Sequence, residues 1–139
     1  MTTDAVIRRL AALAILVAGG VHLDLWLFQG YRSIHVIGPL FLLNAAAAAV
    51  VAALLLARGG TLVELTGLAY AAGTLAAFFV SVYHGLFGFL EVLDGTPQLL
   101  AAATEAVAIG LLLFTLAHAG GGVTLGRSSF SSRGGLDRS

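Results

Sequence analysis

Four long apolar segments dominate this sequence and restrict what it can fold into. They cover roughly residues 5–28, 34–57, 62–90 and 98–118, and each reaches the ~20 apolar residues that an α-helix needs to cross a bilayer. Only 10% of the 139 residues are charged, against about 25% in soluble domains. The sequence therefore predicts an all-α, four-helix transmembrane bundle whose main surroundings are the lipid bilayer.

Short polar breaks separate the apolar segments. Gly30 and Ser33 lie in the first break, and Thr96 and Pro97 close the last; Gly is common just after a helix and Pro at a helix start. The stretch Thr61–Glu64 has the pattern of a capping box that would open the third helix. Because short connections join antiparallel neighbours, we expect an up-down-up-down bundle over residues 1–119.

The composition changes at Gly120. Residues 120–139 are rich in Gly, Ser and Arg and poor in apolar side chains. Such a segment cannot bury enough apolar surface to fold alone, so the sequence predicts a disordered cytoplasmic tail.

The arginines predict the orientation of the bundle. Six of the seven basic residues lie on the side of the N-terminus, and Arg32 alone lies on the other side. Basic residues near the ends of membrane helices favour the cytoplasmic side. We therefore expect a multi-pass protein of the plasma membrane with both termini in the cytoplasm.

Several classes of function are excluded or disfavoured by composition. The chain has no Cys, which excludes disulfides, thiolate metal sites and Cys nucleophiles. Its formal net charge is zero, and it lacks the basic stripe that nucleic-acid binding needs. Neither a phosphate-binding loop nor a nucleophile elbow around Ser81 is present, so we expect no enzymatic activity.

Polar residues inside the apolar segments are the candidate site. With 1.5 Å rise per residue, His22 and His84 lie about 9 Å below the outer ends of their helices. Glu105 lies about 10 Å deep and Asn44 about 15 Å deep. Each predicted helix thus contributes one polar residue to a layer in the outer half of the bilayer, and ionisable groups there usually carry a function.

The faces of the predicted helices favour convergence of these four residues. Helix positions three and four apart share a face. On the third segment, Thr74, Ser81 and His84 fall on one stripe with small residues, and small residues let helices approach closely. We therefore expect His22, His84, Glu105 and Asn44 to face the bundle interior.

A second polar set lies nearer the outer surface, with Trp26 and Tyr31 as interfacial aromatic residues. We interpret it as a polar vestibule above the buried layer, in which Asp24 would pair with Arg32; the alternative is a set of charges that simply touch water. Its members are Asp24, Arg32, His35, Glu91 and Asp94.

Three functions remain open for the buried layer. Two imidazoles and a carboxylate would bind or relay a proton, a cation or a small ligand. Alternatively, His22 and His84 would be axial ligands of a b-type haem, or with Glu105 would hold a metal ion. In the third alternative the protein is a structural accessory subunit, whose polar layer only joins the helices. Four helices are few for a transport path, so a homo-oligomer or a larger membrane complex is expected.

Parts of the sequence resemble a known group of proteins. These are His22-Leu23-Asp24-Leu25-Trp26, the following Gly30-Tyr31-Arg32 and Ile37–Leu43, and Gly85–Phe89 together with Glu105. The chain resembles small, uncharacterised four-helix integral membrane proteins of high-GC actinobacteria. The resemblance implies the membrane topology and no particular activity.

Overall fold

The computed structural model of the chain describes residues 2–93 and 95–121. Within them it has four long helices and one short 3-10 helix, η1 (Tyr31–Ser33), and all four long helices are long and apolar enough to cross a membrane. The all-α four-helix bundle predicted from the sequence is confirmed. Asp94 and residues 122–139, most of the predicted tail, lie outside the described residues. The four helices are α1 (Thr3–Phe28), α2 (Ile37–Ala57), α3 (Thr61–Tyr83) and α4 (Thr96–Gly121).

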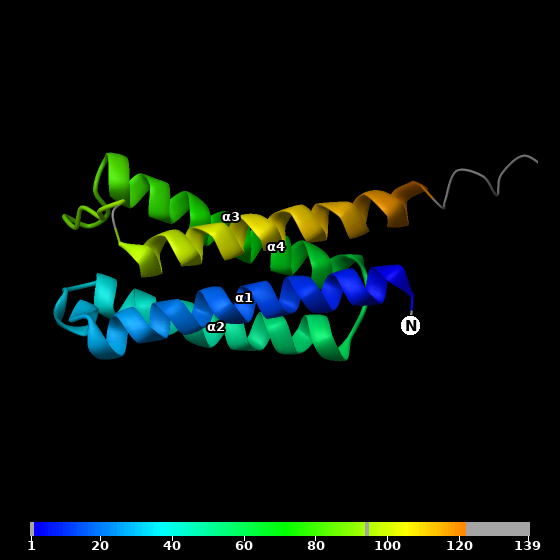
Figure 1. The fold of residues 1–139 in the computed structure, drawn as a ribbon, viewed down its shortest axis with the longest axis horizontal. Coiled ribbons are helices and arrows are strands. Elements are labelled where there is room, and N and C mark those ends of the chain that lie inside the picture. Colours follow the sequence, from blue (N-terminus) through cyan, green and yellow to red (C-terminus); the bar gives the residue numbers. More distant parts are fainter. Residues whose placement is uncertain (1, 94, 122–139) are drawn as a thin grey trace, which may run out of the picture.

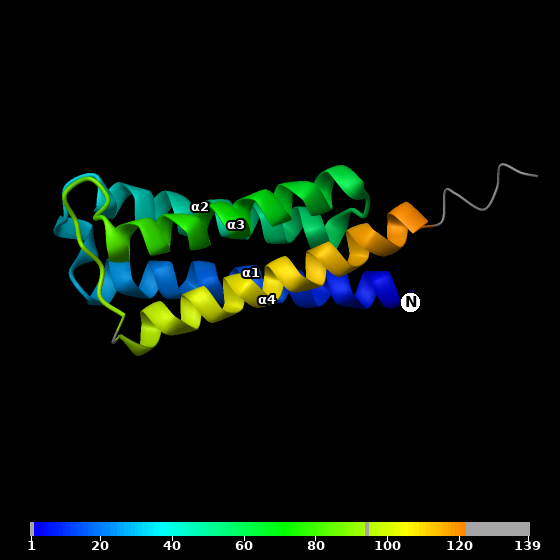
Figure 2. The same cartoon turned by 90° about the horizontal axis from the view of Figure 1, so that it is seen from above.

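The helices form an up-down-up-down bundle (Figures 1 and 2). The N-terminus, the end of α4 and the α2–α3 connection lie at one end, which we name the terminal end. The other two connections lie at the opposite end, which we name the loop end. The packing is uneven: α1 packs extensively against α2 and α4, whereas α2 and α3 touch each other much less.

Small residues bring the closely packed helices together. Ala12, Ala18 and Gly19 of α1 are buried, as are Ala48 and Ala52 of α2. A Cβ atom on Gly19 would collide with the Cβ atom of Ala48, so only glycine allows this approach. Close backbone approach is how helices pack in a membrane, where lipid is as apolar as a leucine side chain.

The third helix is shorter than the sequence predicted. It ends at Tyr83 and not near residue 90, because Gly85, Phe87 and Gly88 all have positive φ angles, which an α-helix cannot contain. Residues 84–93 instead form a loop that folds back at the loop end. Apolar composition alone hid this boundary, since the loop is as hydrophobic as the helix before it.

The second helix also starts later than the sequence predicted. It begins at Ile37, after η1 and a residue with positive φ, Val36. Pro39 therefore lies in the first turn of α2, where its missing N–H is not needed. A Cβ atom on Gly38 would lie 2.7 Å from the carbonyl oxygen of Arg32, so this glycine lets the connection fold tightly against the helix start.

An ion pair joins three helices near the terminal end. A guanidinium nitrogen of Arg8 lies 3.8 Å from the carboxylate of Glu64, and Arg8 Nε donates a 3.0 Å hydrogen bond to the carbonyl oxygen of Leu55. The capping box predicted for Glu64 is wrong: Gly60 precedes α3 without a side-chain cap. Glu64 is 6% exposed and is directed to Arg8 instead.

Candidate ligand site between the helices

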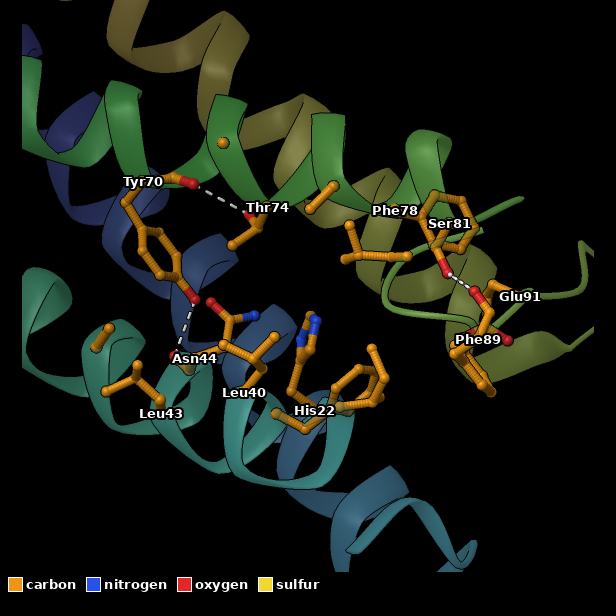
Figure 3. A pocket seen from close by; sticks show the side chains of 16 residues that line it. His22, Leu40, Leu43, Asn44, Tyr70, Thr74, Phe78, Ser81, Phe89 and Glu91 are labelled. Atoms are coloured by element: carbon orange, nitrogen blue, oxygen red, sulfur yellow. Dashed lines mark hydrogen bonds between the residues drawn. The ribbon is translucent and has the colours of Figure 1, made fainter. Parts of the chain in front are cut away.

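A cavity of about 350 Å³ lies between α2 and α3, on the side toward the loop end. It exists where these two helices pack least closely, and α1 contributes its floor through His22 (Figure 3). Its lining is mostly apolar, including three phenylalanine rings. The polar lining residues come from three helices and the 84–93 loop: His22, Asn44, Tyr70, Thr74, Ser81 and Glu91.

His22 presents one free ring nitrogen to this cavity. Its Nδ1 atom lies 2.8 Å from the carbonyl oxygen of Ala18; because a carbonyl only accepts, Nδ1 must carry the proton. In the neutral ring, Nε2 is therefore the acceptor, and no described residue donates to it. The ring lies against Phe41, with centroids 5.0 Å apart, which holds Nε2 in place.

Asn44 also has a side chain without a protein partner. The hydroxyl group of Tyr70 on α3 donates a 3.1 Å hydrogen bond to the backbone carbonyl of Asn44 on α2. Among the described residues, the side-chain amide of Asn44 has no hydrogen bond, and Figure 3 shows it directed into the cavity beside the ring of His22. An amide facing an apolar space without partners is unusual in a membrane helix, so it is available to a ligand.

Glu105 lies next to this cavity, deep in the bundle. It is 2% exposed, and its Oε1 atom has no hydrogen-bond partner in the described part of the chain. It lines a second cavity of about 20 Å³, together with His22 and Glu91, and that volume is enough for about one water molecule. The two cavities share His22, Phe41, Phe78 and Glu91, so they are adjacent.

Glu105 faces α3 on its other side. The hydroxyl group of Thr74 lies close to the carboxyl group, while that hydroxyl also donates to the backbone carbonyls of Tyr70 and Ala71, both at 3.1 Å. Thr74 is therefore satisfied without Glu105. An ionisable group buried within a membrane helix usually carries a function.

A hydrogen-bond network at the loop end includes Gln98, which the sequence analysis missed, and Tyr31, which it placed at the membrane interface. Tyr31 donates to the carboxylate of Glu91, 2.9 and 3.0 Å from its two oxygens. Gln98 Nε2 donates to the Tyr31 hydroxyl at 2.9 Å, and the backbone N–H of Val92 donates to Glu91 Oε1 at 3.1 Å. Burial raises the pKa of Tyr31 to about 12; Gln98 opposes this rise and Glu91 adds to it.

This network corrects the prediction for Tyr31. The residue is 8% exposed, so it is not an aromatic anchor at the membrane interface. One feature of the sequence could have indicated this network: Tyr31, Glu91 and Gln98 all lie beside predicted helix ends on the same side of the bundle. A buried Tyr or Gln in that position needs a partner.

The loop of residues 84–93 covers the loop end of the cavity. Leu86 and Phe89 form a tight turn through two backbone hydrogen bonds of 2.7 and 2.9 Å, and both line the cavity. The N–H of Glu91 donates to the carbonyl oxygen of Ser81 at 3.2 Å, which ties the loop to the last turn of α3. Access from that end is therefore closed by protein.

We expect Tyr31→Phe to destabilise the bundle by about 1–3 kcal/mol, because it leaves the buried Glu91 and Gln98 without a shared partner. The same substitution should also change how the stability of the bundle depends on pH in the alkaline range. Between pH 10.0 and about 12 the tyrosine ionises in the unfolded chain but keeps its proton in the fold. Stability should therefore fall with rising pH across this window in the unaltered protein.

Detergent unfolding at several pH values, with tyrosinate absorbance recorded in parallel, measures both effects. Tyr83→Phe is the matched control, because Tyr83 is 67% exposed at the end of α3. Equal stability of the two variants would contradict a stabilising role for the network.

The structure does not bring His84 to the site. The residue follows the last turn of α3, is exposed and lines neither cavity. Its predicted depth of about 9 Å depended on a helix that continued to residue 90, and that helix ends at Tyr83. His22 and His84 therefore do not face each other across a common cavity, as two axial haem ligands would.

The outer polar set is only partly assembled. Glu91 lines both cavities, as a vestibule residue would, whereas Arg32 and His35 are exposed and line neither. Asp24 accepts a 3.0 Å hydrogen bond from Gln29 Nε2, so the predicted pair with Arg32 is not formed. Over residues 2–93 and 95–121, no three His, Asp or Glu side chains lie close enough to hold a metal ion.

Comparisons with known proteins do not add a family to this description. No family model, no curated protein and no solved structure matches the chain. The four apolar helices decide the general class. This is a small multi-pass membrane protein.

Proposed function

We propose that the protein binds a small ligand in the cavity between α2 and α3 and exchanges a proton at Glu105. The observation that carries the proposal is the carboxyl group of Glu105, which is 2% exposed and has an unpartnered Oε1 atom in the described chain. Beside it, His22 Nε2 and the Asn44 amide also have no hydrogen-bond partner among the described residues; His22 lines both cavities and Asn44 the larger one. Three unused polar groups of this kind are what a polar ligand needs in an apolar pocket.

Each of the three residues has a distinct role in this proposal. Glu105 holds the exchangeable proton or, once ionised, balances a positive charge. His22 accepts a hydrogen bond or a proton at Nε2, because its Nδ1 proton is held by Ala18. Asn44 orients the ligand through an amide that donates and accepts. The exposed His84 has no role here. One chain forms the whole cavity, so binding does not require a second copy.

Modification by dicyclohexylcarbodiimide tests the proposal. This apolar reagent dissolves in the bilayer and converts protonated carboxyl groups to N-acylureas. Mass spectrometry is expected to find the adduct on Glu105, in decreasing yield as the pH is raised, since the ionised form does not react. Glu64, which is held by Arg8, is the internal control and is expected to remain unmodified. Absence of the adduct on Glu105 would favour a purely structural role for the polar residues.

We also propose that the terminal end faces the cytoplasm at the plasma membrane, as the arginine distribution suggests. The chain contains no Cys, so the labelling of a single introduced cysteine shows which side of the membrane that position faces, with no labelling of native residues. His35→Cys at the loop end is expected to react with a membrane-impermeant maleimide in intact cells. Thr61→Cys at the terminal end is expected to react only after permeabilisation. The reverse pattern would contradict this orientation.

A further inference from the structure

Two carboxyl groups and no guanidinium group line the two adjacent cavities. Glu91 lines both cavities, Glu105 lines the smaller one, and no Arg lines either. Glu91 already accepts hydrogen bonds from Tyr31 and from the backbone of Val92. Glu105 forms no ion pair with an arginine among the described residues, so a positive charge brought from outside the protein would stabilise its ionised form. An anionic ligand, such as a phosphate or a fatty-acid carboxylate, would meet repulsion here.

Aromatic rings surround the same space. Phe41 and Phe78 line both cavities, and Phe89 lines the larger one. The faces of such rings attract cations, most strongly where water is excluded. Apolar walls with aromatic rings and a carboxyl group suit an organic cation better than a metal ion, which needs several oxygen or nitrogen ligands.

The cavity is open to the side of the bundle that faces lipid. Leu43, 64% exposed, stands at its α2 edge. On the α3 edge, a Cβ atom on Gly73 would have no neighbour within 4 Å, so no side chain closes the cavity at that position. At the loop end the cavity is lined by Leu86 and by Phe89, which Figure 3 shows there. A ligand that enters between α2 and α3 must therefore already be dissolved in the bilayer.

We propose that the ligand is a lipophilic organic cation, an ammonium group on an apolar or aromatic body, which exchanges with the proton of Glu105. This inference rests on the proposed function and names its ligand. The exchange is balanced: the protonated acid loses H⁺ to water, and the carboxylate that remains pairs with the cation. A volume of about 350 Å³ is near the lower end for ligand pockets, so one ring with its ammonium group fits, and a longer chain would extend into lipid.

The pH dependence of binding follows from this exchange. A proton and the cation compete for one carboxylate, so affinity is expected to rise by up to tenfold per pH unit while the competing proton is being displaced. Three other titratable groups face Glu105: His22 on α1, Tyr70 on α3 and Glu91 on the loop after α3. From α2 only the apolar Phe41 lines the small cavity.

The test uses the purified protein in nanodiscs of phosphatidylcholine. Benzyltrimethylammonium, which has no titratable proton, is compared with neopentylbenzene, its neutral isostere with carbon in place of nitrogen. Equilibrium dialysis against empty nanodiscs is expected to show saturable binding of the cation near one per chain, at least tenfold tighter than the isostere. Because this comparison uses the unaltered protein, it does not depend on a variant that folds.

Two variants assign the pH dependence. Glu105→Gln is expected to weaken cation binding at least tenfold and to remove its pH dependence. His22→Gln is expected to keep the pH dependence, and Glu64→Gln at the terminal end should bind as the unaltered protein does. Equal binding of cation and isostere, or cation binding that does not change with pH, would overturn this inference. In that case a carbodiimide adduct on Glu105 would still support the proposed function. If neither the adduct nor selective cation binding is found, both the proposed function and this inference are overturned.

Discussion

Glu105→Leu is expected to make the folded bundle more stable by about 1–3 kcal/mol, because it removes a buried polar group that lacks a partner. Leucine is close to glutamate in size, and Thr74 keeps its two backbone acceptors on α3 without the carboxyl group. The same change should abolish the carbodiimide adduct and reduce binding of the ammonium probe at least tenfold. A gain in stability with a loss of binding is the pattern of a residue kept for function.

Unfolding in mixed detergent micelles, followed by circular dichroism, measures this change. Glu64→Leu is the matched control, because it removes a second glutamate that is buried within a helix and leaves Arg8 without its partner. The two leucine variants should therefore shift stability in opposite directions. A loss of stability in Glu105→Leu would contradict our proposal and would indicate that the carboxyl group joins helices α3 and α4.

Arg8→Met is expected to destabilise the bundle by about 3–5 kcal/mol, because it leaves the carboxylate of Glu64 buried without a counter-charge. The Arg8 side chain is 18% exposed and that of Glu64 8%, so water compensates little for the lost pair. The change also removes the hydrogen bond from Arg8 to the carbonyl oxygen of Leu55. Contacts from α1 to both α2 and α3 would be lost together.

A double-mutant cycle tests this explanation in the same unfolding experiment. Replacing both partners, Arg8→Met with Glu64→Leu, should recover most of the loss, since two apolar side chains leave no buried charge behind. Arg32→Met at the loop end is the control, because Arg32 is exposed and lines neither cavity. Losses that simply add in the double variant would show that the pair is not coupled.

Local properties of the chain made the architecture predictable. A segment crosses a membrane because of its length and hydrophobicity, and both can be counted along the sequence. For the same reason His22, Asn44 and Glu105 stood out as polar residues in apolar surroundings. His22 lines both adjacent cavities, Asn44 the larger one and Glu105 the smaller one. The prediction failed for His84, because the positive φ angles that end α3 lie in residues as apolar as the helix itself.

Pairings across distant elements could not be predicted in this way. The hydrogen bonds that join Tyr31 to Glu91 and Gln98 connect positions 60 and 67 residues apart, and nothing local marks those residues as partners. The cavity likewise exists because α2 and α3 pack less closely than the other neighbouring helices. The sequence alone determined that this protein spans the membrane with four helices and carries polar groups within them. Tertiary structure decided which groups are left without partners, because a hydrogen bond or a void depends on which side chains from separate helices come into contact.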